Sequence, residues 1–388
     1  MQSEFPDLGE TAPEISPSEL KSRLDGGESF TMVDTRRPAD FEAWKITHPN
    51  LTVVNVPFTE FLDDAEEEAA SELPEGIPNG TLVTSCAKGL SSTFVAEFLQ
   101  KEGHQALALQ DGMEGWAALY EHHILQTDRD GATVIQFHRP STGCLSYLCV
   151  GGSEAAVIDP LRAFLDEYQQ IARDHDATLE FALDTHVHAD HVSGVSDLAA
   201  KTGATPVHPV GATERGLTTE PRLIEDGETL SLGPETLTAR ALPGHTTEMT
   251  GYEFADVLAV GDTIFLDGVA RPDLEDDDAA REAAGTLWET IQSVGARGDE
   301  LTIAPGHVDP TTAPGHDGSF TETLGTLRDR LQAFEESREE FVDRITSNLG
   351  AQPNNFEEII EINLGRQSAS PSESFELELG PNNCAVTD

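Results

Sequence analysis

The sequence has very little positive charge. Lysine occurs only at Lys21, Lys45, Lys88, Lys101 and Lys201, and Lys and Arg together number 23 against 71 Asp and Glu, a formal net charge of −48. Nucleic acids and anionic membranes bind basic patches, so we expect neither as a partner. Self-repulsion of this size is screened in molar salt, where the Debye length is about 3 Å. The composition therefore indicates a halophilic protein from a salt-rich cytoplasm.

Cysteine and long apolar runs are also scarce. The four cysteines, Cys86, Cys144, Cys149 and Cys384, are too few and too irregularly spaced for a disulfide framework. No apolar stretch reaches transmembrane length, and no basic region with an apolar run opens the chain, so we expect a reducing, cytoplasmic setting. Cys144 and Cys149 lie in one apparent strand at an odd separation, which predicts core thiols on opposite faces.

What the chain does contain is a dense group of metal-ligand side chains. His186, His188, Asp190 and His191 fall within six positions. A short apolar strand precedes them, and an amphipathic segment that ends at Gly203 follows. The group therefore lies on a strand-to-helix loop, where several side chains can be aimed at one point. Imidazole and carboxylate are the usual ligands of zinc and non-haem iron, so the loop predicts a metal site.

Three more ligand-type residues follow apolar stretches further along the chain. His245 stands in Pro-Gly-His, Asp262 in Gly-Asp and His307 in Pro-Gly-His. A neighbouring glycine lets the backbone turn sharply, so that each side chain can approach a common centre. Taken singly, each could be a turn residue, but as an ordered series behind the histidine loop they predict a completed metal centre.

In this order the residues resemble the metallo-β-lactamase superfamily, over about residues 131 to 365. Within it the chain looks most like the persulfide dioxygenases, with glyoxalase II as a near relative. The resemblance implies an αββα sandwich and one Fe(II) per chain on His186, His245 and Asp262. Two imidazoles and one carboxylate leave positions open for O₂ and a substrate sulfur. The other ligand-type residues would then orient these groups or the substrate: His188, Asp190, His191 and His307.

Two alternatives stay open. In the glyoxalase II pattern all seven residues bind two metals, two Zn or mixed Zn/Fe, which activate a hydroxide for hydroxyacyl-thiol hydrolysis. A non-catalytic sulfur carrier or persulfide sensor is the third reading. All seven residues are present in both enzymes, so ligand identity does not choose between the dioxygenase and the hydrolase. Loss of a ligand would favour the carrier or sensor, but all seven positions are filled.

The segment after Asp262 favours the dioxygenase. It resembles the Gly-x-Gly-Arg-x-Asp stretch of that family, with Arg271 and Asp273 on the charged positions as substrate-binding candidates. Ala270 replaces the second glycine, and Val308 and Asp309 follow His307 where the family often has Asp-Tyr. The alternative, without a role in substrate binding, is that Arg271 and Asp273 form a surface ion pair that contributes little to stability.

A second candidate site lies in the N-terminal third. Cys86 follows an apolar strand and precedes residues 93–103, which read as an amphipathic helix closed by a glycine. The N–H groups and dipole of a helix N-terminus stabilise an anionic sulfur and lower a thiol pKa. Lys88 would add positive charge.

This region, over about residues 13 to 122, resembles the rhodanese-like sulfurtransferases. The resemblance makes Cys86 the residue that accepts sulfane sulfur and passes it to a nucleophile. Phosphatases of this fold carry Arg six residues after the cysteine, whereas this chain has Ser92. Without that guanidinium, phosphate chemistry is disfavoured.

The sequence thus predicts an α/β rhodanese-like domain (13–122) followed by an αββα metallo-β-lactamase sandwich (131–365). A polar join is expected at 122–131, and a mobile tail at 366–388 in which residues 375–379 could add an edge strand. The predicted function is a persulfide dioxygenase that oxidises a thiol persulfide with O₂ to sulfite and free thiol, coupled to sulfur transfer through Cys86. Its expected partners are a small-molecule thiol persulfide, O₂, sulfite and thiosulfate. A homodimer is one open oligomeric state.

Overall fold

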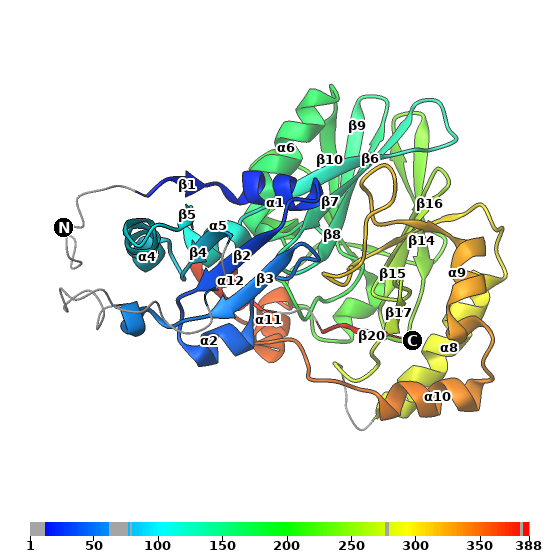
Figure 1. Ribbon diagram of the computed structural model, residues 1–388. Helices are drawn as coiled ribbons and strands as arrows, with labels where there is room; N and C mark the ends of the chain where they lie inside the picture. The colour runs from blue at the N-terminus through cyan, green and yellow to red at the C-terminus, as the bar shows by residue number, and fades with distance from the viewer. Residues whose placement is uncertain (1–11, 62–76, 78–79, 276–278, 381–382, 388) are drawn as a thin grey trace. The chain divides into compact units, whose positions relative to one another are not determined.

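A computed structural model describes residues 12–61, 77, 80–275, 279–380 and 383–387 (Figure 1). The chain divides after Leu119 into two compact units, each with its own sheets and core. No described helix is long and apolar enough to cross a membrane.

The first unit contains one five-stranded sheet in which every pairing is parallel. Apolar side chains alternate along its central strand, so Leu82 and Val83 enter separate clusters on the two faces. Helices cover both faces, as a parallel sheet requires. The strands, in sheet order, are β1 (Glu14–Ile15), β5 (Gln105–Leu109), β4 (Thr81–Ser85), β2 (Phe30–Asp34) and β3 (Leu51–Asn55). The helices are α1 (Pro17–Asp25), α2 (Pro38–Ala43), α4 (Leu90–Lys101) and α5 (Gly112–Ala117).

The second unit contains two larger mixed sheets and one small antiparallel pair. The seven-stranded sheet runs β12 (Arg222–Ile224), β11 (Thr205–Pro209), β10 (Thr178–Leu183), β9 (Glu154–Ile158), β8 (Cys144–Gly151), β7 (Ala132–Arg139) and β6 (Glu121–Leu125). The six-stranded sheet runs β13 (Thr229–Leu232), β14 (Glu235–Ala241), β15 (Thr250–Phe254), β16 (Val257–Gly261), β18 (Thr302–Pro305) and β19 (Glu322–Thr323). The small pair is β17 (Gly268–Ala270) with β20 (Ala385–Thr387).

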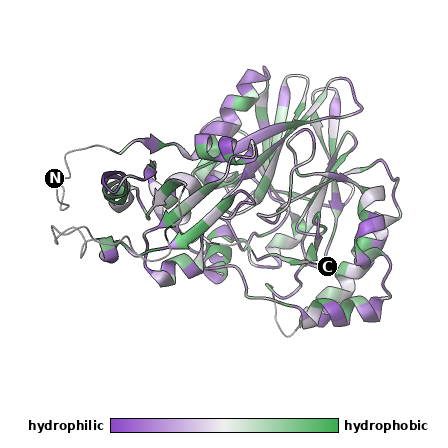
Figure 2. Cartoon of the chain, viewed as in Figure 1, coloured by the Kyte–Doolittle hydropathy of each residue, from purple (hydrophilic) through white to green (hydrophobic). Residues whose placement is uncertain are grey.

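The two larger sheets pack face to face, with helices on their outer faces. One apolar cluster joins Val134 and Tyr147 of the first sheet to Leu237 and Tyr252 of the second. α6 (Leu165–Asp174) and α7 (Val195–Thr202) pack on the outside of the first sheet, and α8 (Ala280–Gly295) lies over the second. Figure 2 shows both hydrophilic and hydrophobic residues on these helices, as one-sided burial requires. The predicted αββα sandwich is confirmed.

The register of the parallel strands gathers polar residues at their carboxyl ends. β9 pairs with β10, so Asp159 and Asp184 follow neighbouring strands. β16 pairs with β18, with Gly261 opposite Pro305, so Asp262 and His307 leave the other sheet together. Ligand sites in open sheets commonly lie at such strand ends.

The C-terminal segment differs from the prediction. Residues 375–379 are not a strand: α12 (Pro371–Leu377) includes Phe375, because Ser370 and Glu373 form a capping box and Pro371 occupies the first turn. The tail is also anchored, since Glu378 and Cys384 are buried and β20 pairs with β17. The first part of the expected join at 122–131 is likewise structured, as β6 pairs with β7 from Glu121 to Leu125.

Candidate metal centre and sulfur-transfer cysteine

Three side chains predicted as iron ligands lie together. His186 leaves the end of β10, His245 follows β14, and Asp262 follows β16. Asp262 Oδ2 lies 4.0 Å from His186 Nε2 and 3.7 Å from His245 Nε2. These separations exceed a hydrogen bond but suit a shared ion, whose nitrogen and oxygen ligands lie about 2.0–2.2 Å away. All three side chains are buried, with exposed fractions of 1% or less.

Each histidine of this triad is oriented by its other ring nitrogen. His245 Nδ1 donates to the carbonyl of Arg271 at 2.7 Å. His186 Nδ1 lies 2.8 Å from Thr185 Oγ1, whose hydroxyl donates to Asp159. The two Nε2 atoms and Asp262 Oδ2 have no hydrogen-bond partner among the described residues. Such orphaned polar atoms are costly unless something binds them, so this donor set fits a metal ion.

The pKa shifts of the three triad residues favour the protonation states that bind a metal ion. Burial, with the neighbouring histidines, lowers the pKa of His186 well below its ordinary value. Burial also lowers the pKa of His245, although Asp262 opposes it. Burial raises the pKa of Asp262, but His307 outweighs it, so the net shift is downward. Neutral imidazoles and an ionised carboxylate are the forms that bind metal.

His188 lies with two carboxylates rather than with the triad. Its Nε2 is 3.0 Å from Asp159 Oδ1 and 3.6 Å from Asp184 Oδ1. Burial and His191 lower its pKa, but the two carboxylates outweigh them and raise the pKa of His188 to about 9. These carboxylates hold the Nε2 side of the ring, while His188 Nδ1 has no hydrogen-bond partner among the described residues.

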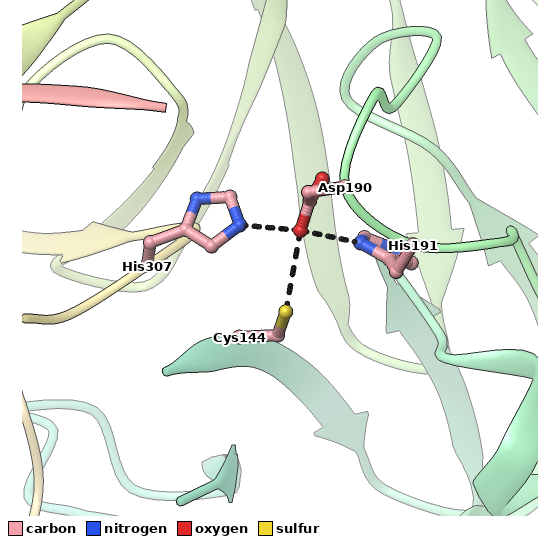
Figure 3. A group of neighbouring side chains, drawn as sticks. All are labelled: Cys144, Asp190, His191 and His307. Atoms are coloured by element: carbon pink, nitrogen blue, oxygen red, sulfur yellow. Dashed lines mark hydrogen bonds and ion pairs between the residues drawn. The ribbon is translucent and has the colours of Figure 1, made fainter. Parts of the chain in front are cut away.

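The remaining predicted residues form another cluster, drawn in Figure 3. Asp190 Oδ2 lies 3.2 Å from His191 Nδ1 and 2.8 Å from His307 Nε2. The Sγ of Cys144 is 3.2 Å from the same oxygen. Cys149 sits in the apolar core, and burial raises its pKa to about 12. Both thiols are buried in separate apolar clusters, as predicted for core thiols on opposite faces, and the start of β8 also brings Cys144 beside the ligand residues.

Residues 184–194, called here the ligand loop, are held by the C-terminal segment. In α11 (Phe356–Asn363), Asn363 Nδ2 donates to the carbonyls of His188 and His191, both at 2.9 Å. Glu378 Oε1 accepts from the backbone N–H of Val192 at 2.9 Å. Its other oxygen pairs with the fully buried Arg139 at 2.5 Å.

Arg271 and Asp273 do not form a surface pair, and Arg271 lines a pocket together with His307. Arg271 is 2% exposed and Asp273 is 7% exposed. The guanidinium binds both carboxylate oxygens of Asp273, at 2.7 and 2.8 Å, and donates to the carbonyls of Gly350, Ala351 and Asn383. Because these bonds occupy its donors, Arg271 anchors the C-terminal segment while its own carbonyl orients His245.

A pocket of about 260 Å³ opens beside His307. Its wall combines the apolar Phe265 and Leu266 with the acidic Asp267 and Asp309. Among the ligand-type residues at the strand ends, His307 lines this pocket.

In the first unit, Cys86 follows β4 and precedes the N-terminus of α4. Ser92 Oγ donates to Cys86 Sγ at 3.4 Å, and the thiol is 6% exposed. Burial raises the pKa of Cys86, but hydrogen bonds from Ser91, Ser92 and the backbone outweigh it and lower the pKa below its ordinary value. A stabilised thiolate at a helix N-terminus is suited to nucleophilic sulfur chemistry.

The ammonium group of Lys88, which was expected to add positive charge near Cys86, forms an ion pair with Glu114. Lys88 Nζ pairs with Glu114 at 2.9 Å, and its side chain is 63% exposed. Its backbone N–H contributes to lowering the Cys86 pKa.

The Ser92 contact makes a testable prediction about the thiol. Replacing Ser92 by Ala removes a donor to the sulfur, so the Cys86 pKa should rise and the alkylation profile should move to higher pH. The measurement is the iodoacetamide rate at Cys86 against pH, read by mass spectrometry, with Thr93→Ala on the same helix as control. An unchanged profile in Ser92→Ala would show that the hydroxyl does not stabilise the thiolate.

Four residues of this region were missed by the sequence reasoning: Cys144, Asp159, Asn363 and Glu378. Asp159 had a usable signal, since it follows a buried strand as Asp262 does. The other three had none, because their contacts join segments far apart in the chain.

Two families account for this architecture. Residues 16–119 match the Rhodanese-like domain, and residues 140–307 match the Metallo-beta-lactamase superfamily. The chain therefore consists of a rhodanese-like domain followed by a metallo-β-lactamase domain, as its motifs predicted.

The similar curated proteins carry two different names, so they limit the choice of function only in part. A beta-lactamase hydrolase-like protein from Xylella fastidiosa is 30% identical over 217 residues, 48% of this chain and 48% of that protein. A hydroxyacylglutathione hydrolase from Vibrio cholerae is 33% identical over 118 residues, 30% of this chain and 45% of that protein. The chain thus spans about half the length of these relatives.

Solved structures agree on the fold. A metallo-beta-lactamase from Staphylococcus aureus superposes with a TM-score of 0.57 at 27% identity, covering 62% of this chain and 75% of that one. ETHE1 from Myxococcus xanthus superposes with a TM-score of 0.52 at 24% identity, covering 60% and 98%. Because the identity to the Myxococcus xanthus protein is only 24%, that similarity supports the fold alone.

Proposed function

We propose that the second unit is an iron-dependent persulfide dioxygenase. The observation that carries the proposal is the set of three orphaned atoms, His186 Nε2, His245 Nε2 and Asp262 Oδ2, that face one another. Two imidazoles and a carboxylate with open positions are typical of non-haem Fe(II) oxygenases. His188 Nε2 pairs with Asp159 at 3.0 Å instead of facing these three atoms.

The reaction converts a thiol persulfide, O₂ and water to the free thiol and sulfite. The S–S bond breaks, and the terminal sulfur gains three oxygens, two from O₂ and one from water. Fe(II), when bound, would hold O₂ and the persulfide sulfur side by side. The protein's part is to fix the two rings through Thr185 and Arg271 and to admit the substrate through the pocket beside His307.

We further propose that Cys86 carries sulfane sulfur for the same pathway. Its thiolate, stabilised by Ser92, would attack a sulfane donor such as thiosulfate and retain the sulfur as a persulfide, releasing sulfite. Transfer to a small thiol would then supply the dioxygenase with its substrate.

The test is O₂ uptake by iron-loaded protein in molar KCl, with sulfite as the scored product. With a small-thiol persulfide, wild type and Cys86→Ser should consume O₂ and form sulfite at the same rate. With thiosulfate plus the free thiol, only wild type should do so. A Cys86→Ser protein that still draws sulfur from thiosulfate would contradict the role of Cys86.

The alternative is a thioester hydrolase, favoured by the similarity to the Vibrio cholerae hydroxyacylglutathione hydrolase. Such an enzyme would hydrolyse a hydroxyacyl thioester without O₂. Thioester turnover under nitrogen, with no uptake on several thiol persulfides, would replace the dioxygenase by this function.

A further inference from the structure

The pocket beside His307 is lined by two carboxylates that one short turn connects. Asp309 begins the turn, and its Oδ1 accepts from the backbone N–H of Thr311 at 2.8 Å and from the Thr311 hydroxyl at 2.6 Å. The N–H of Thr312 donates to the Asp309 carbonyl at 2.9 Å, and the Thr312 hydroxyl donates to Asp267 Oδ2 at 2.7 Å. The turn therefore holds both acidic side chains at the wall of the same pocket.

These hydrogen bonds position the carboxylates but leave their negative charges without a counter-charge. Thr311 and Thr312 donate only neutral N–H and O–H groups. In the part of the chain that the structure describes, neither Asp267 nor Asp309 has a basic side chain within 4.0 Å. Both carboxylates are exposed, and Asp267 Oδ1 and Asp309 Oδ2 lie outside the bonds of the turn. A ligand can therefore reach both negative charges.

The basic side chains that line the pocket already have their partners. Arg271 uses all five guanidinium N–H groups, two on Asp273 and three on backbone carbonyls. His307 lies between two carboxylates, with Nε2 2.8 Å from Asp190 and Nδ1 2.7 Å from Asp262. Among the described lining residues, a ligand thus meets two uncompensated carboxylates and no guanidinium or ammonium with a free donor.

The rest of the wall determines the size and polarity of the ligand. The pocket holds about 260 Å³, whereas pockets for drug-sized ligands hold roughly 300–1,000 Å³, so a small thiol suits it. Phe265 and Leu266 provide apolar side chains against which a methylene chain can be buried. His307 marks the side of the pocket toward the metal-ligand residues, so the sulfur belongs there and the tail of the ligand lies near the acidic wall.

We propose that the carrier thiol of the dioxygenase is a small aminothiol, whose ammonium group binds at Asp267 and Asp309 while its sulfur lies on the His307 side. The inference rests on the proposed dioxygenase function and specifies its substrate class. The two carboxylates attract an ammonium group and repel a carboxylate at the same position, so they select against a carrier with an acidic tail. Contacts between exposed charges are weak singly, so we expect a preference of about 10-fold.

The experiment measures binding without turnover. The iron-loaded full chain is dialysed under nitrogen against cysteamine, 2-mercaptoethanol or 3-mercaptopropionate, which carry an amine, a hydroxyl and a carboxylate on their tails. We expect cysteamine to bind about 10-fold more tightly than 3-mercaptopropionate, with 2-mercaptoethanol between them. The ratio should fall as the KCl concentration rises, because salt screens exposed charges. Since no O₂ is consumed, the result does not depend on dioxygenase activity.

Asp267→Asn and Asp309→Asn remove the charges and keep the size of the side chains. Each should lower the ratio of the cysteamine to the 3-mercaptopropionate affinity by about 3-fold, and the double variant should lose the preference. The three thiols also differ in the acidity of their sulfur, but that difference is the same in every variant, so the change in the ratio reports the carboxylates alone. Asp329→Asn, exposed and outside the pocket lining, should keep the wild-type ratio.

The outcomes separate this inference from the function on which it rests. An equal or reversed order of affinities in wild type, or a preference that the double variant retains, would overturn the aminothiol assignment. The expected order of affinities, together with no O₂ uptake on any of the three corresponding persulfides, would support the selectivity of the pocket and contradict the dioxygenase instead.

Discussion

Replacing Asp262 by Ala should remove iron from the triad and reduce persulfide-dependent O₂ uptake by at least about 100-fold, since losing an outer partner of a ligand already costs about 10–100-fold. Asp262 supplies the triad's one carboxylate, and its Oδ2 lies 4.0 Å from His186 Nε2 and 3.7 Å from His245 Nε2. Without it, two neutral imidazoles would bind Fe(II) weakly and without charge compensation.

The measurement is iron per chain by elemental analysis, followed by O₂ uptake and sulfite formation in the same preparation. Asp329→Asn is the matched control, because Asp329 is an exposed carboxylate that belongs neither to the triad nor to the lining of the pocket beside His307. Circular dichroism confirms that both variants are folded. An Asp262→Ala protein that retains iron and near-wild-type uptake would refute the triad.

Replacing Glu378 by Ala should lower the free energy of unfolding by about 3–5 kcal/mol, the cost of breaking a buried ion pair from one side. Arg139 is fully buried, and its guanidinium lies over the rings of Phe164 and Phe375. The substitution also removes the acceptor of the Val192 N–H, so the ligand loop should bind metal more weakly.

Urea unfolding and a metal titration measure the two effects. Glu376→Ala, two residues earlier and exposed, should change the unfolding free energy by no more than about 0.5 kcal/mol. The double variant Arg139→Met with Glu378→Leu should recover much of the lost stability, because it removes both charges together. Equal stability of Glu378→Ala and Glu376→Ala would show that the pair does not stabilise the fold.

Much of the candidate site could be predicted because its signals are local. His186, His245 and Asp262 each stand where an apolar stretch ends, with ligand chemistry that few other positions share. Strand ends in α/β folds meet at common edges, so the residues could be grouped before their distances were known. Cys86 could also be predicted as a reactive site, because it stands between a strand and an amphipathic helix.

The tertiary structure decided the rest, because those contacts join segments that are distant in the chain. Arg271 was predicted to bind substrate, yet several of its donors bind carbonyls about 80 and 112 positions away in the chain. The tail read as mobile from its polar composition, yet Glu378 is buried against Arg139, 239 positions earlier. Cys144 is a core thiol, as predicted, and only its backbone pairing with His307 also brings it beside Asp190. Periodicity and neighbouring residues therefore determine which elements form and which loops carry ligands, whereas the partner of each buried charge or thiol depends on sheet register and chain packing, which no local pattern encodes.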